Sequence, residues 1–100
     1  MNKLFITAVA ATAMNCLSAT MPPQAQSKGC LSCHAIETKI IGPSYKDVAK
    51  KYVGDKTAQD RLVKKIVNGG SGVWGTMPMP GGLVDEADAR VLVKWILEIK

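Results

Sequence analysis

Apolar residues recur at helical spacing in three segments of the chain, each lying between a capping residue and a stop signal. The first begins at Ser44, whose side chain can cap a helix together with Asp47 at the third helical position. It continues through Tyr52 and ends at Gly54, a residue that favours helix termination. This pattern predicts a short helix directly after residue 44.

Two longer helices are expected nearer the C-terminus. Thr57 and Asp60 open one of them, and an Asn-Gly-Gly sequence at 68–70 ends it. Asp85 and Asp88 open the other. The apolar positions are Leu62, Val63, Ile66 and Val67 in the first of these helices and Leu92, Trp95, Ile96 and Ile99 in the second. Each set repeats every three or four residues and so predicts one buried face.

A long loop rich in glycine and proline separates these two helices. It reads SGVWGTMPMPGG, residues 71–82, and little else in the chain resembles a strand. The pattern therefore predicts an all-α domain with one long loop before its last helix.

The N-terminal segment resembles a signal peptide. Lys3 supplies the positive end, LFITAVAATAM is an apolar run too short to span a bilayer, and small residues follow up to Ala19. We expect residues 1–19 to be this signal and residues 20–100 to be the mature domain. Cleavage after Ala25 is an alternative, but it leaves only four residues before the first cysteine of the mature domain.

Cys16 raises a second alternative, a lipid-anchored protein. Asn15 argues against it, since lipoprotein signals have a small residue at that place. Without residues 1–19, the remaining 81 residues contain Cys30 and Cys33 as their only thiols. A chain of this length buries little apolar surface and usually needs further stabilisation. A disulfide that closes a loop of two residues restricts the unfolded chain too little to supply it.

The two cysteines belong to a Cys30-x-x-Cys33-His34 motif that contains the only histidine of the chain. Zinc would need four ligands, whereas the motif offers three, of which Cys33 and His34 are adjacent. A thioredoxin-type dithiol follows a strand, and no strand-like run precedes Cys30. A haem fits every part of the motif, because the thiols can form thioethers with its two vinyl groups and the histidine can reach the iron.

A methionine thioether from the long loop is the expected ligand at the sixth position of the iron. Met77 and Met79 both follow His34 by more than 40 residues, enough chain to reach the opposite haem face. Pro78 and Pro80 fix the backbone on either side of Met79. The alternative is that both methionines only fill a core.

From Gly29 to Lys100 the chain resembles a small bacterial class I cytochrome c, a periplasmic monohaem electron carrier. The resemblance rests on GCLSCHAIETKIIGPSYKDVAKKY, NGGSGVWGTMPMP and KWILEIK, three motifs in the expected order. It implies three to four helices wrapped around one covalent haem c in a cytochrome c domain, 20–100. It further implies that Cys30 and Cys33 carry the haem, with His34 as the proximal and Met79 as the distal ligand.

The same resemblance implies roles for other residues. The Pro43 carbonyl would accept the second ring proton of His34. Trp74 would donate its indole N–H to a haem propionate, and Lys65 lies where the family often has an arginine that serves this group. The alternatives are that Trp74 is a core residue and that Lys65 is an ordinary solvated lysine. Gly29 would let the last helix cross closely at Trp95.

Two features depart from the family pattern. Relatives commonly continue the methionine loop as Pro-Pro-Asn, whereas this chain has Pro80-Gly81-Gly82 and so lacks an asparagine that would steady the sulfur. Residues 22–27 (PPQAQS) lack the apolar residues of an ordinary first helix, so we expect that helix to be short or frayed.

The function implied is the transfer of single electrons between redox proteins, and we expect no enzyme activity. The alternative is a haem enzyme or gas sensor, for peroxide or nitric oxide, in which Met79 dissociates. The chain offers no distal acid or base for such chemistry, because His34 is its only histidine.

The charge of the chain bears on its partners. The whole chain has 13 basic and 8 acidic residues, and removal of Lys3 with the signal leaves 12 against 8, a net charge of +4. Lysines concentrate in the middle, at Lys46, Lys50, Lys51, Lys56, Lys64 and Lys65. They would steer the protein to acidic docking faces of an oxidase, a reductase or another periplasmic redox enzyme. Alternatively, they only keep the protein soluble. We expect neither nucleic-acid binding nor stable membrane insertion.

Overall fold

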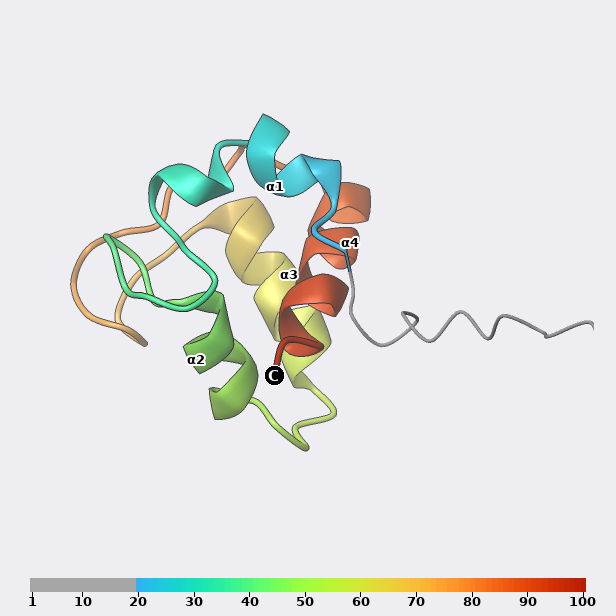
Figure 1. Cartoon of the computed structure of the whole chain (residues 1–100). Helices are drawn as coiled ribbons and strands as arrows, with labels where there is room; N and C mark the ends of the chain where they lie inside the picture. The colour runs from blue at the N-terminus through green and yellow to red at the C-terminus, as the bar shows by residue number, and fades with distance from the viewer. Residues whose placement is uncertain (1–19) are drawn as a thin grey trace, which may run out of the picture.

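The computed structural model describes residues 20–100, which form an all-helical fold (Figure 1). Its elements are α1 (Pro23–Ser27), the short 3-10 helix η2 (Cys30–Ser32), α2 (Tyr45–Lys51), α3 (Ala58–Asn68) and α4 (Glu86–Leu97). Within these residues two isolated β-bridges, His34 with Lys39 and Gly70 with Met79, are the only extended pairings. Among the same residues, none of the helices is long and apolar enough to cross a membrane. The expected signal peptide lies outside the described residues.

Side-chain caps set the starts of α2 and α4. The Ser44 hydroxyl accepts a hydrogen bond of 3.1 Å from the Asp47 amide, and the Asp85 carboxylate accepts one of 2.8 Å from the Asp88 amide. Each bond satisfies an amide that the helix itself leaves free. The two predicted helix starts are thereby confirmed.

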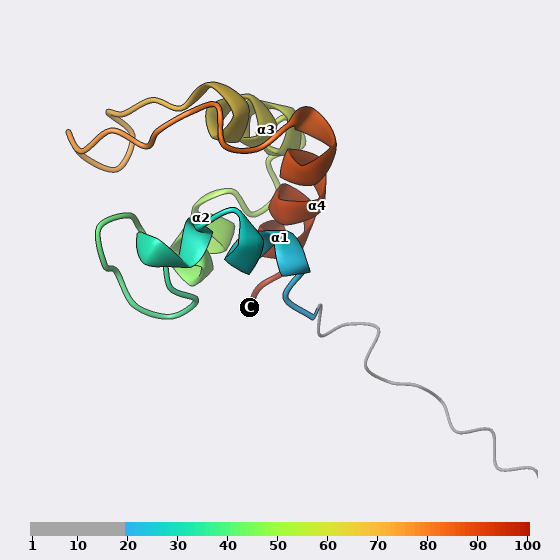
Figure 2. The same cartoon turned by 90° about the horizontal axis from the view of Figure 1, so that it is seen from above.

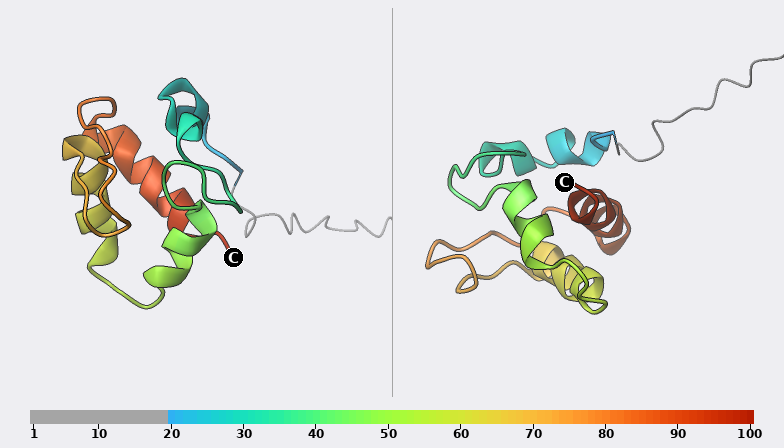
Figure 3. Two further views of the ribbon diagram at one scale, coloured as in Figure 1. Left: turned by 90° about the vertical axis from the view of Figure 1, so that its left-hand side faces the viewer. Right: turned by 60° about the horizontal axis from the view of Figure 1, so that its bottom comes forward.

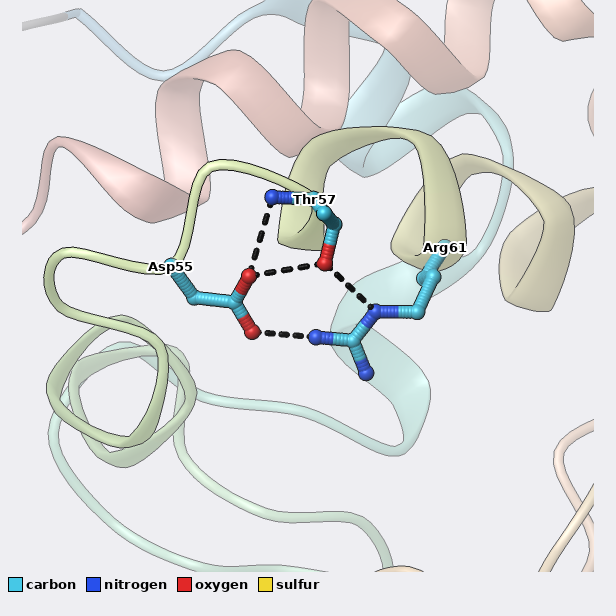
Figure 4. Close-up of polar contacts among 3 residues, drawn as sticks. All are labelled: Asp55, Thr57 and Arg61. Carbon is cyan, nitrogen blue, oxygen red and sulfur yellow. Dashed lines mark hydrogen bonds and ion pairs between the residues drawn. The ribbon is translucent and has the colours of Figure 1, made fainter.

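Helix α3 begins where expected, but Thr57 does not cap it in the expected way. The Thr57 hydroxyl donates to the Asp55 carboxylate over 2.8 Å, and the Thr57 amide donates to the same oxygen over 2.9 Å. Arg61 pairs with the other oxygen of Asp55 and also donates to Thr57 (Figure 4). We call these three residues the Asp55 cluster. It ties the turn between α2 and α3 to the first turns of α3.

Helix α1 is short, as predicted, with five residues. Pro23 starts it, which suits the first turn because proline has no amide to satisfy there. Ala25 is its one buried residue, and Gln24 donates a hydrogen bond of 3.2 Å to Asp88 at the start of α4. Helix α1 has no apolar face, and a small apolar contact together with one polar contact holds it against the rest of the fold.

Helix α4 is the centre of the fold and packs against α3, α2 and α1. The core is small, and its members are Ala25, Tyr45, Val48, Val63, Val84, Ala89, Leu92, Val93, Trp95 and Ile96. Two segments extend from the same side of this helical layer, as Figures 2 and 3 show. We call them the Cys-His segment, residues 29–43, and the Met loop, residues 69–83. These two segments position the functional residues.

Candidate functional site

The Cys-His segment brings its three motif residues together in one tight turn. Gly29 precedes η2 with φ of 76°, a left-handed conformation that glycine adopts without strain. The His34 amide donates to the Cys30 carbonyl over 3.0 Å, and Cys30 and Cys33 are both free, half-buried thiols. The predicted role of Gly29 was wrong, since the space around a Cβ at this position is open among the described residues. Its backbone angle, not close helix packing, explains the glycine.

Three contacts fix the orientation of the His34 ring. Its Nδ1 lies 2.7 Å from the carbonyl oxygen of Pro43, so this nitrogen carries the proton and Nε2 is left free as a donor atom for a metal. The ring stacks on Tyr45 with centroids 5.0 Å apart, and Tyr45 meets Trp95 of α4 edge to face at 5.3 Å. A Cβ at Gly42 would collide with the imidazole, so this glycine is required by close approach.

The Met loop holds Met79 at its base. Gly70 and Met79 exchange two backbone hydrogen bonds, of 3.0 and 2.8 Å, which close the loop just after α3. Met79 is half-buried, whereas Met77 is 67% exposed. A Cβ at Gly81 would collide with the Asn68 carbonyl, so the end of the loop can return past α3 only with glycine there. Gly81 therefore has a packing role in this chain, where the family pattern has proline.

One apolar cleft lies between the two segments, with α2, α3 and α4 behind it. His34, both cysteines and Pro43 line one side, and Met79, Met77 and Trp74 line the other. Its further apolar lining consists of Ile41, Tyr45, Val48, Tyr52, Leu62, Ile66, Val73, Leu83, Val84, Leu92, Val93 and Ile96.

Several of these apolar lining residues are largely exposed. Ile41, Val73, Met77 and Leu83 are between 51% and 67% exposed. A flat apolar macrocycle inserted between the segments would cover them, with two thiols and an imidazole on one side and a thioether on the other. The residues present therefore fit a haem attached to the Cys-x-x-Cys-His motif.

The two residues expected at the propionates also line the cleft. Lys65, in the last turn of α3, is half-buried, and its ammonium lies against Gly70. Trp74, in the Met loop, is 40% exposed and lines the same cleft. The Lys51 ammonium lies 5.6 Å from the centre of its indole ring. The structure thus brings both residues to the cleft, with a second basic group, Lys51, beside Trp74.

Burial raises the pKa of the Cys30 thiol and of the Tyr45 hydroxyl above their ordinary values. The Tyr45 hydroxyl therefore stays neutral beneath His34, where a phenolate would disturb the site electrostatically.

The cytochrome c family model matches residues 23–100. The chain belongs to the cytochrome c family. It is 55% identical to cytochrome c-552 of Hydrogenobacter thermophilus over 76 residues, which cover 76% of this chain and 78% of the relative. It is 49% identical to cytochrome c-551 of Pseudomonas aeruginosa over 75% of this chain and 72% of the relative. The crystal structure of wild-type Nitrosomonas europaea cytochrome c552 matches with a TM-score of 0.73 and 47% identity, over 76% of this chain and 95% of that one.

These findings confirm the predicted family, the all-helical fold and the cofactor. This cytochrome c carries haem c covalently, as its Cys30-x-x-Cys33-His34 motif implies, and it is an electron carrier that acts with other redox proteins. The match to small c-551 and c-552 cytochromes favours this function over that of a haem enzyme or gas sensor.

Sequence reasoning assigned no role to Tyr45, Gly42 or Gly81. The signal for Gly42 and Tyr45 was the segment GPSY, which lies within the motif that carried the family resemblance. Gly81 stood out only as a departure from the family pattern. Its packing against the end of α3 becomes visible only when the loop is closed in space.

Proposed function

We propose that this cytochrome c is a periplasmic one-electron carrier. In this proposal Cys30 and Cys33 hold the haem through thioethers, and His34 and Met79 are the axial ligands of its iron. When bound, the haem supplies a reversible one-electron change at iron. The observation that carries the proposal is the placement of His34 and Met79 on opposite sides of one apolar cleft.

The surroundings of His34 support its role as proximal ligand. A ligand histidine works best when its second nitrogen donates to a fixed acceptor, which sets both the tautomer and the ring orientation. The Pro43 carbonyl at 2.7 Å is such an acceptor. Stacking on Tyr45, itself braced by Trp95, restrains the ring further.

The surroundings of Met79 support its role as distal ligand in preference to Met77. The paired hydrogen bonds with Gly70 restrain the backbone of Met79, and Pro78 and Pro80 restrict it on both sides. Met77 lies in the exposed part of the loop. A thioether held in place favours the reduced iron and so raises the reduction potential.

Trp74 and Lys65 line the same cleft, which supports their roles at the haem propionates. The indole N–H would donate to one carboxylate, and the ammonium would partly neutralise the charge. Both groups would thereby stabilise propionates at the edge of an otherwise apolar site.

We further propose export by residues 1–19 and docking on acidic faces of partners such as a cytochrome oxidase, a reductase or another periplasmic redox enzyme. Lys46, Lys50 and Lys51 are exposed on α2, and Lys51 lies beside Trp74 of the cleft lining. Exposed lysines beside a haem edge would speed association with such partners at low ionic strength.

The visible spectrum of the holoprotein tests the ligand pair. We expect low-spin iron with a Met-to-iron charge-transfer band at neutral pH. A high-spin spectrum would show that the sixth position is open and would contradict the proposal.

Substitution of the two methionines decides which of them is the ligand. Met79→Ala should remove the charge-transfer band, lower the potential and open the iron to added ligands. Met77→Leu should keep the band and change the free energy of unfolding by less than about 1.5 kcal/mol, since it is a near-isosteric change at an exposed position. A band that survives Met79→Ala but disappears in Met77→Leu would make Met77 the ligand.

A further inference from the structure

The Lys51 side chain lies between aromatic rings of two different elements. Its ammonium is 5.8 Å from the ring centre of Tyr52, the residue that follows α2, and 5.6 Å from that of Trp74 in the Met loop. A cation within about 6 Å of an aromatic ring is attracted to its face. Lys51 thus connects the end of α2 to the Met loop across the mouth of the cleft. We call this the Lys51 contact.

Trp74 lies in the part of the Met loop farthest from its closed base. The hydrogen bonds between Gly70 and Met79 close the base. The Gly72 amide donates to the Gly75 carbonyl over 2.7 Å and forms a tight turn that contains Trp74. Residues 71–78 are exposed throughout. A contact at Trp74 therefore restrains a projecting loop whose base carries Met79.

The other side of the contact is fixed. Tyr52 is half-buried and lines the cleft, and the Arg61 guanidinium lies 5.6 Å from its ring centre. Arg61 is in turn bound by Asp55 and Thr57 (Figure 4). The Asp55 cluster thus holds the ring against which Lys51 rests, so the Met loop is tied to a rigid turn.

We propose that Lys51 is a positioning residue for Met79. By attracting Trp74 it keeps the Met loop closed over the haem and lowers the rate at which Met79 leaves the iron. The proposal rests on Met79 being the axial ligand. An exposed cation–π contact is weak, so its loss should speed opening by about two- to fivefold.

Imidazole binding to the ferric holoprotein measures this opening, because imidazole takes the sixth position only after Met79 has left. At saturating imidazole the rate of binding should rise about two- to fivefold in Lys51→Gln, which keeps chain length but removes the charge. Lys51→Arg retains the cation and should bind at the wild-type rate. The matched control is Lys50→Gln, an equal loss of charge at the adjacent exposed position, and it should also leave the rate unchanged. Equal rates in Lys51→Gln and Lys50→Gln, or no rescue by Lys51→Arg, would overturn the proposal.

Hydrogen exchange at the Gly72 amide provides a readout that does not require Met79 on the iron. This amide should exchange faster in Lys51→Gln than in the wild type, Lys51→Arg or Lys50→Gln. Unchanged exchange would overturn the Lys51 contact even if the imidazole rates differed. If the wild type lacks the Met-to-iron band while exchange responds as expected, the ligand assignment fails and the contact itself stands.

Discussion

At the scale of single residues, His34 owes its orientation to neighbours that have no metal-binding chemistry of their own. Gly42 provides room for the ring, Pro43 accepts its proton, and Tyr45 supports one face. The sequence allowed the Pro43 contact to be predicted, because family resemblance gave that residue a role. Stacking on Tyr45 depends on how α2 is placed against α4, and local sequence does not determine this.

Gly42→Ala tests whether this close approach matters for function. The added methyl would overlap the imidazole and push it away from Pro43, so we expect a shifted reduction potential and a loss of about 1–3 kcal/mol in the free energy of unfolding. Redox titration and chemical denaturation of the holoprotein would measure both.

The control is Gly54→Ala, in the turn after α2. Gly54 has φ of 77° with open space around it, so alanine there should cost about 1–2 kcal/mol through backbone strain alone. It should leave the potential unchanged. Equal potentials in both variants would show that Gly42 serves only stability.

At the scale of elements, capping residues predicted the helix starts better than they predicted the contacts made there. Ser44 and Asp85 form the expected caps because each is followed by an amide at the right distance. Thr57 has the right identity for a cap, but Asp55 two residues earlier takes up its hydroxyl and its amide. A competing carboxylate in the preceding turn therefore changed the contact without moving the start of α3.

The Asp55 cluster should make stability depend on pH. Hydrogen bonds from Thr57, and secondly the charge of Arg61, hold the pKa of Asp55 below its ordinary value. The folded state therefore favours the carboxylate form. The resulting stability is present above the unfolded pKa of ~3.9 and is lost as the pH falls through the lower folded value.

Denaturation of the wild type and Asp55→Asn at a series of pH values would test this. Asp55→Asn should be less stable than the wild type at pH ~6, and the difference should shrink as the pH falls below the ordinary aspartate pKa of ~3.9. Arg61→Gln should cause a smaller loss at neutral pH, because the Thr57 hydrogen bonds remain. A difference between wild type and Asp55→Asn that stays constant with pH would contradict this interpretation.

At the scale of the whole molecule, the haem accounts for the part of the fold that the apolar pattern of the sequence does not predict. The helices, their order and the long loop could be predicted because each depends on local sequence signals. The protein core is small, with Leu92 and Val93 as its largest apolar side chains below 2% exposure in the described part of the chain. The closure of the Met loop on Gly70 and Gly81 could not be predicted, since it depends on backbone contacts between the two ends of a long irregular loop.

A protein organised around its haem should not fold well without it. Replacement of both Cys30 and Cys33 by alanine should abolish covalent attachment and leave the chain largely unfolded, because much of the buried apolar surface is shared with the haem. Far-UV circular dichroism of the purified variant, compared with the wild-type holoprotein, would measure the helix content. A helical variant that unfolds cooperatively would show that the protein core suffices.

The positive charge of the molecule should control how fast it docks on its redox partners. Reversal of charge at Lys50 and Lys51 should slow electron transfer to an acidic redox partner at low salt and have little effect at high salt. Since Lys51 also contacts Trp74, Lys50→Glu alone separates docking from any change in the Met loop. We expect Lys50→Glu to lower the association rate by roughly threefold or more at 0.01 M salt, where the screening length is about 30 Å, and to match the wild type near 1 M, where it is about 3 Å.

Lys94→Glu is the matched control for this experiment. Lys94 is exposed on α4, so its reversal changes the net charge by the same amount on a different helix. Stopped-flow mixing with the partner should show a smaller effect for Lys94→Glu than for Lys50→Glu, because the proposal assigns docking to the lysines of α2. Equal effects of the two reversals would mean that only net charge matters, and the lysines of α2 would then serve solubility and not docking.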